Sequence, residues 1–177
     1  GNSYYYVVTA TDIFGNESGY SEEVFATAPG IITIFSTDFE EDEGGFMTGK
    51  VETGSYYKNC WEWGKPISGP GEALTGTKLW ATNLAGKYDS NSRGYIKSPP
   101  IEIPENIIAT LYFDHWIESE TIAGWPNDYG AVEISDDDGK TWHDVVGRLG
   151  EAEGNGKWER KEISLADYAG KTIPVRF

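Results

Sequence analysis

The chain has 177 residues, 14 of them basic and 29 acidic, which gives a formal net charge of -15 at pH 7. Apolar residues make up 38% and aromatic residues 14%, which excludes a disordered acidic tail, and 22 glycines with 8 prolines disfavour a helical bundle. The acidity excludes a nucleic-acid partner, and the longest apolar run, residues 31–35, is too short for membrane insertion.

The first predicted element is a β-hairpin. Residues 4–11 are rich in Tyr, Val and Thr, residues 12–18 form a turn around Gly15-Asn16, and residues 22–28 form the returning strand. The pattern Tyr4-x-Tyr6-x-Val8-x-Ala10-x-Asp12 resembles the penultimate strand of a fibronectin type III domain, in which Tyr4 would be the corner tyrosine. Residues 1–29 are therefore predicted to be the C-terminal part of such a domain.

The remainder, residues 30–177, is predicted to be a second all-β domain, a jelly-roll-type β-sandwich. One helical turn is expected at residues 165–169, with Ser164 as its cap. The predicted strands are residues 31–39, 60–64, 78–82, 94–98, 107–117, 130–135, 141–146, 157–163 and 172–177.

Residues 107–117 form the longest of these predicted strands, and their alternation defines two faces. One face carries Ala109, Leu111, Phe113, His115 and Ile117, and the other carries Ile108, Thr110, Tyr112, Asp114 and Trp116. The first face predicts an aliphatic core. The second predicts either the concave side of the sandwich or an aromatic core seam.

An Asp-box pattern, S-x-D-x-G-x-T-W, follows the strand at residues 130–135. It predicts a hairpin in which the aspartate accepts hydrogen bonds from turn amides, the glycine takes a left-handed conformation and the tryptophan folds back over the turn. We interpret the motif as structural, since function separates readily from such motifs. Its residues are Ser135, Asp137, Gly139, Thr141 and Trp142.

An acidic segment, residues 38–43, offers hard oxygen ligands at alternating positions. Asp38, Glu40 and Asp42 are the candidate ligands of a structural calcium ion. The competing interpretation is an ordinary solvated acidic turn.

The order of short motifs from residue 35 to residue 177 resembles the accessory β-sandwich of bacillopeptidase F-like secreted subtilases. A related MAM-like sandwich occurs in immune inhibitor A-type metallopeptidases. In these families a further Asp-rich strand follows the V-R-F motif, so the sandwich is predicted to lack its last strand. The motifs are Asp38-Phe39-Glu40, Trp61-Glu62-Trp63-Gly64, Leu79-Trp80-Ala81-Thr82-Asn83, Leu111-x-Phe113-Asp114-His115-Trp116 and Val175-Arg176-Phe177.

The resemblance implies a non-catalytic accessory module of an exported, extracellular, multidomain bacterial hydrolase, most simply a peptidase. Its partners would be the parent catalytic domain and a polysaccharide or protein substrate. The alternative is a carbohydrate-binding module of a secreted or surface protein. In that case Trp116, Trp125 and Tyr129 would stack on sugar rings, whereas the competing interpretation assigns these rings to the core.

The sequence gives little support for a stand-alone enzyme. The single cysteine, Cys60, allows no internal disulfide and is predicted to be a small packed residue. The two histidines, His115 and His143, lie outside any H-E-x-x-H pattern, and the sequence has no G-x-S-x-G elbow or Walker A loop. We therefore predict no catalytic residues in this chain.

Overall fold

The computed structural model describes residues 2–27, 30–51, 57–119, 121–122, 125–126, 128–150 and 156–177, and for residues 121–122 and 125–126 it describes the backbone only. The chain divides into two compact units, Gly1–Thr33 and Ile34–Phe177. The boundary predicted from the sequence lies slightly earlier, between residues 29 and 30.

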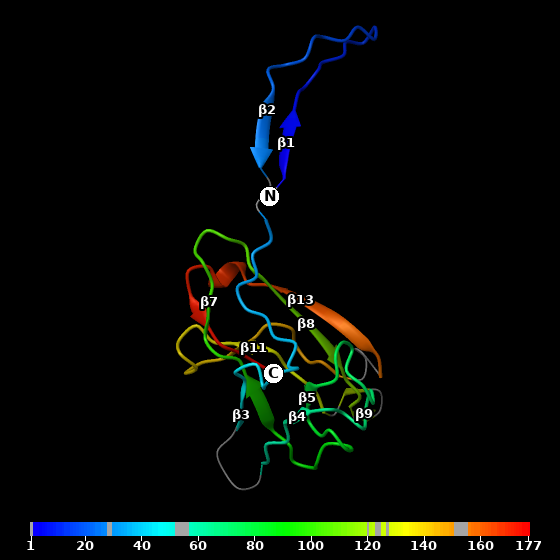
Figure 1. Ribbon diagram of the computed structural model, residues 1–177, viewed down its shortest axis with the longest axis vertical. Helices are drawn as coiled ribbons and strands as arrows, with labels where there is room; N and C mark the ends of the chain where they lie inside the picture. The colour runs from blue at the N-terminus through cyan, green and yellow to red at the C-terminus, as the bar shows by residue number, and fades with distance from the viewer. Residues whose placement is uncertain are drawn as a thin grey trace. The chain divides into compact units, whose positions relative to one another are not determined.

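The first unit is a β-hairpin of two antiparallel strands, β1 (Ser3–Tyr6) and β2 (Val24–Thr27) (Figure 1). Its far end is shaped by Asp12, whose Oδ1 accepts hydrogen bonds from the backbone N–H groups of Phe14 (2.8 Å) and Asn16 (2.9 Å). Gly15 has a φ of 85°, which glycine adopts without steric cost. The predicted strands and turn are present, and the strands are shorter than predicted.

Both faces of this hairpin expose large apolar side chains. Tyr4 and Tyr6 on one face and Tyr5 and Phe25 on the other are all exposed, and the rings of Tyr5 and Phe25 lie 6.1 Å apart. Two strands alone cannot bury a hydrophobic face, so the hairpin has no core of its own.

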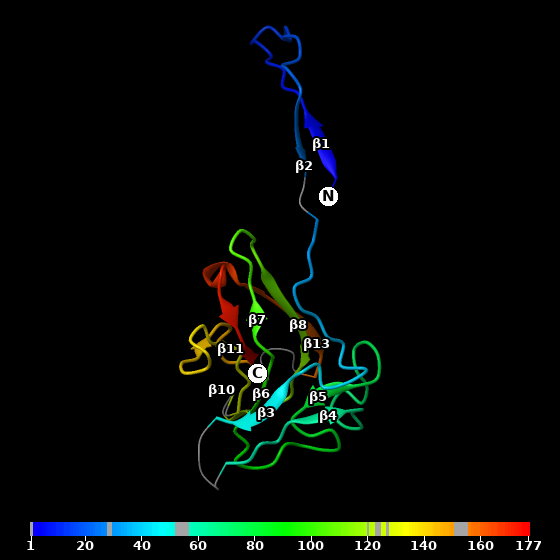
Figure 2. The same cartoon turned by 60° about the vertical axis from the view of Figure 1, so that its left-hand side comes forward.

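The second unit contains a five-stranded sheet (Figures 1 and 2). Its strands follow the order β12-β11-β15-β6-β3, and all four pairings are antiparallel. The strands are β3 (Met47–Lys50), β6 (Gly94–Lys97), β11 (Glu133–Ile134), β12 (His143–Asp144) and β15 (Val175–Arg176).

A long two-stranded ribbon forms the other layer. Strands β8 (Thr110–Trp116) and β13 (Trp158–Ser164) run antiparallel over their full seven residues and lie side by side in both views (Figures 1 and 2). Three short antiparallel pairs complete the unit: β4 (Glu62–Gly64) with β5 (Leu79–Ala81), β7 (Ile101–Glu102) with β14 (Thr172–Ile173), and β9 (Thr121–Ile122) with β10 (Trp125–Pro126).

The hydrophobic core lies between the five-stranded sheet and the ribbon. Val132, Ile134 and Val175 contribute from the sheet side, and Ala109 and Ile163 contribute from the ribbon side. Leu111, Phe113 and Ile117 pack against this cluster, as the alternation predicted. Apolar residues from two β-layers thus meet in one core, which confirms the predicted all-β sandwich.

The opposite face of β8 points away from the core. Ile108 is 84% exposed and Tyr112 is 55% exposed, so this face is not an aromatic core seam. The sequence left two interpretations of this face, the concave side of the sandwich and an aromatic core seam, and the structure excludes the core seam.

Several predicted elements differ from those observed. The predicted strand at residues 31–39 is wrong: residues 30–39 contain no strand, and Ile31 and Ile32 are exposed. Strand preference depends on pairing with a neighbouring strand, and residues 30–39 pair with none of the described strands. Strands β3, β7, β9 and β10 were not predicted. The expected helical turn is a 3-10 helix, Ala166–Tyr168, and the Ser164 Oγ accepts a hydrogen bond from the Ala166 backbone N–H (3.3 Å).

Truncation of a core side chain tests this arrangement. Ile134 is fully buried, so Ile134→Ala should lower the free energy of unfolding by about 2–5 kcal/mol, because it removes buried contacts and leaves a cavity. Ile108→Ala is the matched control, and its effect should stay within about 0.5 kcal/mol. Urea unfolding followed by circular dichroism measures both, and equal losses would contradict the assigned faces of the ribbon.

Candidate binding site

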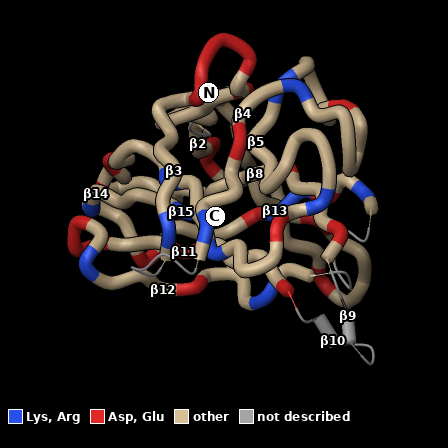
Figure 3. The backbone as a smooth tube through the Cα atoms, turned by 90° about the horizontal axis from the view of Figure 1, so that it is seen from below, with Lys and Arg blue, Asp and Glu red and all other residues tan. Residues whose placement is uncertain are grey.

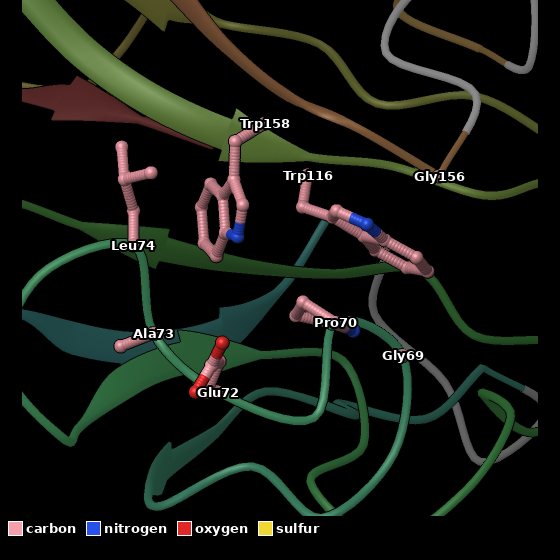
Figure 4. A pocket seen from close by; sticks show the side chains of 8 residues that line it. All are labelled: Gly69, Pro70, Glu72, Ala73, Leu74, Trp116, Gly156 and Trp158. Atoms are coloured by element: carbon pink, nitrogen blue, oxygen red, sulfur yellow. The ribbon is translucent and has the colours of Figure 1, made fainter.

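A cavity of about 350 Å³ lies where the ribbon meets the loop of residues 69–74 (Figure 4). Trp116, the last residue of β8, and Trp158, the first residue of β13, line the side formed by the ribbon. The opposite side comes from the loop, and the lining there includes Pro70, Glu72 and Leu74. In Figure 4 Glu72 lies below Trp158, Leu74 stands beside Trp158 on the side away from Trp116, and Pro70 lies below Trp116.

The register of the ribbon places the two tryptophans together. Trp158 pairs directly with Trp116, and directly opposed residues of an antiparallel pair point to the same face. Two positions along each strand, Arg160 pairs with Asp114 through two hydrogen bonds, from Nε to Oδ1 (2.9 Å) and from Nη2 to Oδ2 (2.7 Å). This bond to Arg160 lowers the pKa of Asp114, and the bidentate pair fixes the register beside the cavity.

The loop that forms the opposite side is held by backbone contacts. The Ser68 Oγ donates to the carbonyl oxygens of Leu84 and Gly86, each at 3.2 Å. Gly69 has a φ of 61°, and a Cβ atom there would lie 3.1 Å from Cζ3 of Trp116. Glycine therefore permits both the turn and the close approach of the loop to the indole.

The described tryptophans of the second unit differ in the bonds of their indole N–H groups, and Trp61, outside the cavity, makes no such bond to another described residue. Trp63, Trp80 and Trp142 each donate to a backbone carbonyl oxygen, at 2.9, 3.3 and 3.1 Å. Within the described residues, the N–H groups of Trp116 and Trp158 donate to no protein acceptor. These two N–H groups are hydrogen-bond donors, and the carboxylate of Glu72, which belongs to the same lining, is an acceptor.

Two of the ligand residues predicted from the sequence, Trp116 and Tyr129, lie in different places. Trp116 lines the cavity, whereas Tyr129 lies outside its lining, is 49% exposed and stacks under the guanidinium of Arg148 (4.4 Å). The side chain of Trp125 lies outside the described residues. Sequence reasoning missed Trp158 and Glu72. The sequence shows an aromatic residue, Trp158, near the start of the predicted strand at residues 157–163. It does not show that this residue pairs with Trp116.

The turn between β11 and β12 contains the five predicted Asp-box residues. The Oδ1 of Asp137 accepts hydrogen bonds from Ser135 Oγ (2.9 Å) and from the backbone N–H groups of Lys140 (3.0 Å) and Thr141 (2.8 Å), and its Oδ2 accepts from Thr141 Oγ1 (2.7 Å). Gly139 has a φ of 81°. These bonds, led by that from the Thr141 backbone, hold the pKa of Asp137 well below its usual range.

Trp142 connects this turn to the sheet. Its indole N–H donates to the Gly139 carbonyl oxygen (3.1 Å), and the Arg176 guanidinium lies 4.2 Å from its ring centroid. Arg176 also forms an ion pair with Glu133, from Nε to Oε2, at 2.6 Å. The carboxylate of Asp137 is committed to the turn, and this geometry is suited to structural stabilisation.

A second cavity, of about 420 Å³, lies beside the same turn. Its lining includes Asp136, Asp138, Lys140 and Lys171. Lys171 Nζ and Asp136 Oδ2 form an ion pair at 2.7 Å, and the bond to Lys171 lowers the pKa of Asp136. These two charged groups are thus engaged with each other.

The acidic segment at residues 38–43 has a different arrangement from a calcium loop. Both oxygens of Glu40 are engaged: Oε1 accepts from the backbone N–H groups of Thr77 (2.8 Å) and Lys78 (2.7 Å), and Oε2 accepts from Thr77 Oγ1 (2.8 Å). Asp38 and Asp42 accept local backbone hydrogen bonds. Throughout the described ranges, no group of three His, Cys, Asp or Glu residues could hold a metal ion. The calcium site at Asp38, Glu40 and Asp42 therefore stays a prediction.

The residues considered for catalysis lie apart from the aromatic cavity. His115 packs beside Phe113 in β8, with ring centroids 5.7 Å apart, and His143 is exposed in β12. Burial raises the pKa of the Cys60 thiol, which lowers its thiolate fraction at neutral pH. No histidine or cysteine lines either described cavity.

Acidic residues outnumber basic residues in this chain, 29 to 14. Acidic and basic segments are interspersed in the view of Figure 3, with acidic segments more frequent. Among the residues that the structure describes, no helix is long and apolar enough to span a bilayer.

The second unit is thus an all-β sandwich with a small cavity lined by two tryptophans. A 149-residue stretch covering 84% of the chain is 33% identical to a segment of Bacillopeptidase F from Bacillus subtilis (strain 168). The chain spans only 10% of the length of that relative. No protein-family profile and no solved structure matches the chain. Most of this chain is therefore similar to one segment of a Bacillopeptidase F.

The hydrogen bonds of Asp137 predict a pH-dependent stability. Because folding lowers the pKa of this group, its contribution is fully present above the unfolded value of about 3.9 and is lost as pH falls towards the folded value. Asp137→Asn should therefore lower the melting temperature at pH 7, and its difference from the wild type should shrink between about pH 4 and pH 2. A constant difference across this range would contradict the carboxylate's role. Asp138→Asn, at the neighbouring turn residue, is the control.

Thermal melting also tests calcium binding. If Asp38, Glu40 and Asp42 hold a structural ion, EGTA should lower the melting temperature and added Ca²⁺ should restore it. Because both oxygens of Glu40 already accept hydrogen bonds from Thr77 and Lys78, we expect the midpoint to remain unchanged. A reversible shift would show that the segment rearranges around the ion, and it should then be absent in Asp38→Asn.

Proposed function

We propose that this chain is a non-catalytic accessory module of a secreted, multidomain bacterial peptidase. In this role it stabilises or positions the catalytic domain, or contacts the substrate or the cell surface. The observation that carries the proposal is the comparison with Bacillopeptidase F, in which most of this chain matches one tenth of a much longer protein. A segment of that size, folded as a separate sandwich, has the dimensions of one module in a multidomain chain.

The chemistry of the described residues supports this proposal. The cavity offers aromatic rings, two indole N–H donors and one carboxylate, with neither a histidine nor a cysteine in its lining. The carboxylates of Asp137 and Glu40 accept hydrogen bonds from backbone N–H groups and hydroxyl groups. A binding role requires no nucleophile–base pair, whereas peptide hydrolysis requires an activated nucleophile or a metal-bound water.

The first unit supports an arrangement of several modules in one protein. Its exposed apolar faces are those of a hairpin that belongs to a larger sheet. The proposal includes the assignment of residues 1–29 to the last two strands of a fibronectin type III domain, on the strength of the motif around Tyr4. An extracellular location belongs to the same proposal.

Activity measurements test the accessory role. The isolated chain should release no peptides from casein beyond the buffer control, because its described residues present no catalytic pair. Deleting the matching segment from Bacillopeptidase F should leave the hydrolysis of a short chromogenic peptide unchanged. The same deletion should reduce thermal half-life or the turnover of a polymeric substrate. Turnover by the isolated chain, or loss of activity on the short peptide with a folded catalytic domain, would contradict the proposal.

A further inference from the structure

We propose that the cavity between Trp116, Trp158 and Glu72 binds a pyranose ring of a neutral polysaccharide. The inference deepens the accessory role, on which it rests, by naming the chemical class that the module contacts. The proposed site consists of two tryptophans, which the register of the ribbon places opposite each other, and of the Glu72 carboxylate from a separate loop.

The shape and surface of the cavity suit a small, flat ligand. Its volume of about 350 Å³ falls at the lower end of the roughly 300–1,000 Å³ that small-molecule sites occupy. Two indoles from adjacent strands form one side, while Pro70 and Leu74 contribute apolar surface from the loop (Figure 4). The C–H groups of a sugar ring pack on aromatic faces of this kind.

The hydrogen-bonding groups distinguish a sugar from other ligands that stack on tryptophan. The two indole N–H groups require acceptors, and the Glu72 carboxylate requires donors. A sugar hydroxyl supplies both in one group. A lysine ammonium has donors but no acceptor, and a proline-rich peptide has carbonyl acceptors but few donors. The complete set of polar groups therefore favours a polyhydroxylated ring.

The charge of the site predicts selectivity among polysaccharides. Glu72 is the single charged side chain in the described lining, and the whole chain carries a net charge of -15. A uronate or phosphate group would meet this carboxylate without a compensating cation, since Arg160 is paired with Asp114. We therefore expect neutral polysaccharides to bind and polyanionic ones to be rejected.

The walls of the cavity are held in place independently of a ligand. The Arg160–Asp114 pair fixes the ribbon beside the tryptophans, and the Gly156 backbone N–H donates to the Ile117 carbonyl oxygen (3.0 Å) next to the pair. Ser68 anchors the loop that carries Glu72. A site assembled in this way loses little conformational freedom on binding.

Affinity electrophoresis and calorimetry with the intact chain test the inference. The probes are mixed-linkage β-glucan, arabinoxylan and chitin oligosaccharides, with polygalacturonate as the anionic polymer and a proline-rich peptide as the competing ligand. We expect retardation by at least one neutral glycan and none by polygalacturonate. No binding to any neutral glycan, equal binding to polygalacturonate, or binding of the peptide instead would overturn the inference.

Four variants locate the binding to this cavity. Trp116→Ala and Glu72→Ala should each weaken binding about tenfold or more, because they remove a central contact. Trp158→Phe keeps a stacking ring but removes the N–H donor, so it should weaken binding about three- to tenfold and should fold normally. Tyr112→Ala is the matched control, since Tyr112 is exposed on the same face of β8 outside the cavity.

The outcomes separate this inference from the accessory role. Glycan binding that survives both Trp158→Phe and Glu72→Ala would overturn the assignment to this cavity. Circular dichroism and melting confirm that each variant is folded. Absence of glycan binding leaves the casein and deletion results untouched, so the accessory role can stand when the inference fails. Peptide hydrolysis by a chain that also binds glycan would contradict the accessory role alone.

Discussion

The second unit depends on the pairing of β15, a strand of two residues at the centre of the five-stranded sheet. Val175 pairs with Ile134 of β11, and Arg176 pairs with Lys97 of β6. Phe177 exchanges two backbone hydrogen bonds with Ile96, at 2.9 and 3.1 Å. A central strand satisfies its backbone groups on both sides, which allows so short a segment to join the two halves of the sheet and close the core.

The same pairing connects the core to the Asp-box turn. It places Arg176 against Glu133 and over the Trp142 ring, while Asp137 binds the turn from within. Local hydrogen bonds thus shape the turn. The guanidinium of Arg176, which is far from the turn in the sequence, packs on its Trp142 ring and holds the turn against the sheet. The hydrogen bonds of Asp137 thus run to residues of the turn itself, which is the arrangement expected of a structural carboxylate.

The β8–β13 ribbon serves two purposes through its two faces. Its inner face supplies Ala109 and Ile163 to the core, and its outer face carries Trp116 and Trp158 at the cavity. Core packing therefore fixes the position of the cavity, as a rigid scaffold does for a recognition surface. An accessory module needs this property because it must retain its contact surface without help from a catalytic domain.

The sequence by itself determined the all-β class, the hairpin around Gly15-Asn16, the inner face of residues 109–117 and Trp116 as a candidate ligand residue. These features follow from local alternation and turn chemistry, which depend on neighbouring residues only. Tertiary structure decided that residues 31–39 form no strand, and that Trp158 and Glu72 join Trp116 while Tyr129 does not. Strand pairing and cavity lining depend on register between segments far apart in the chain, and a one-residue slip would turn each side chain to the opposite face.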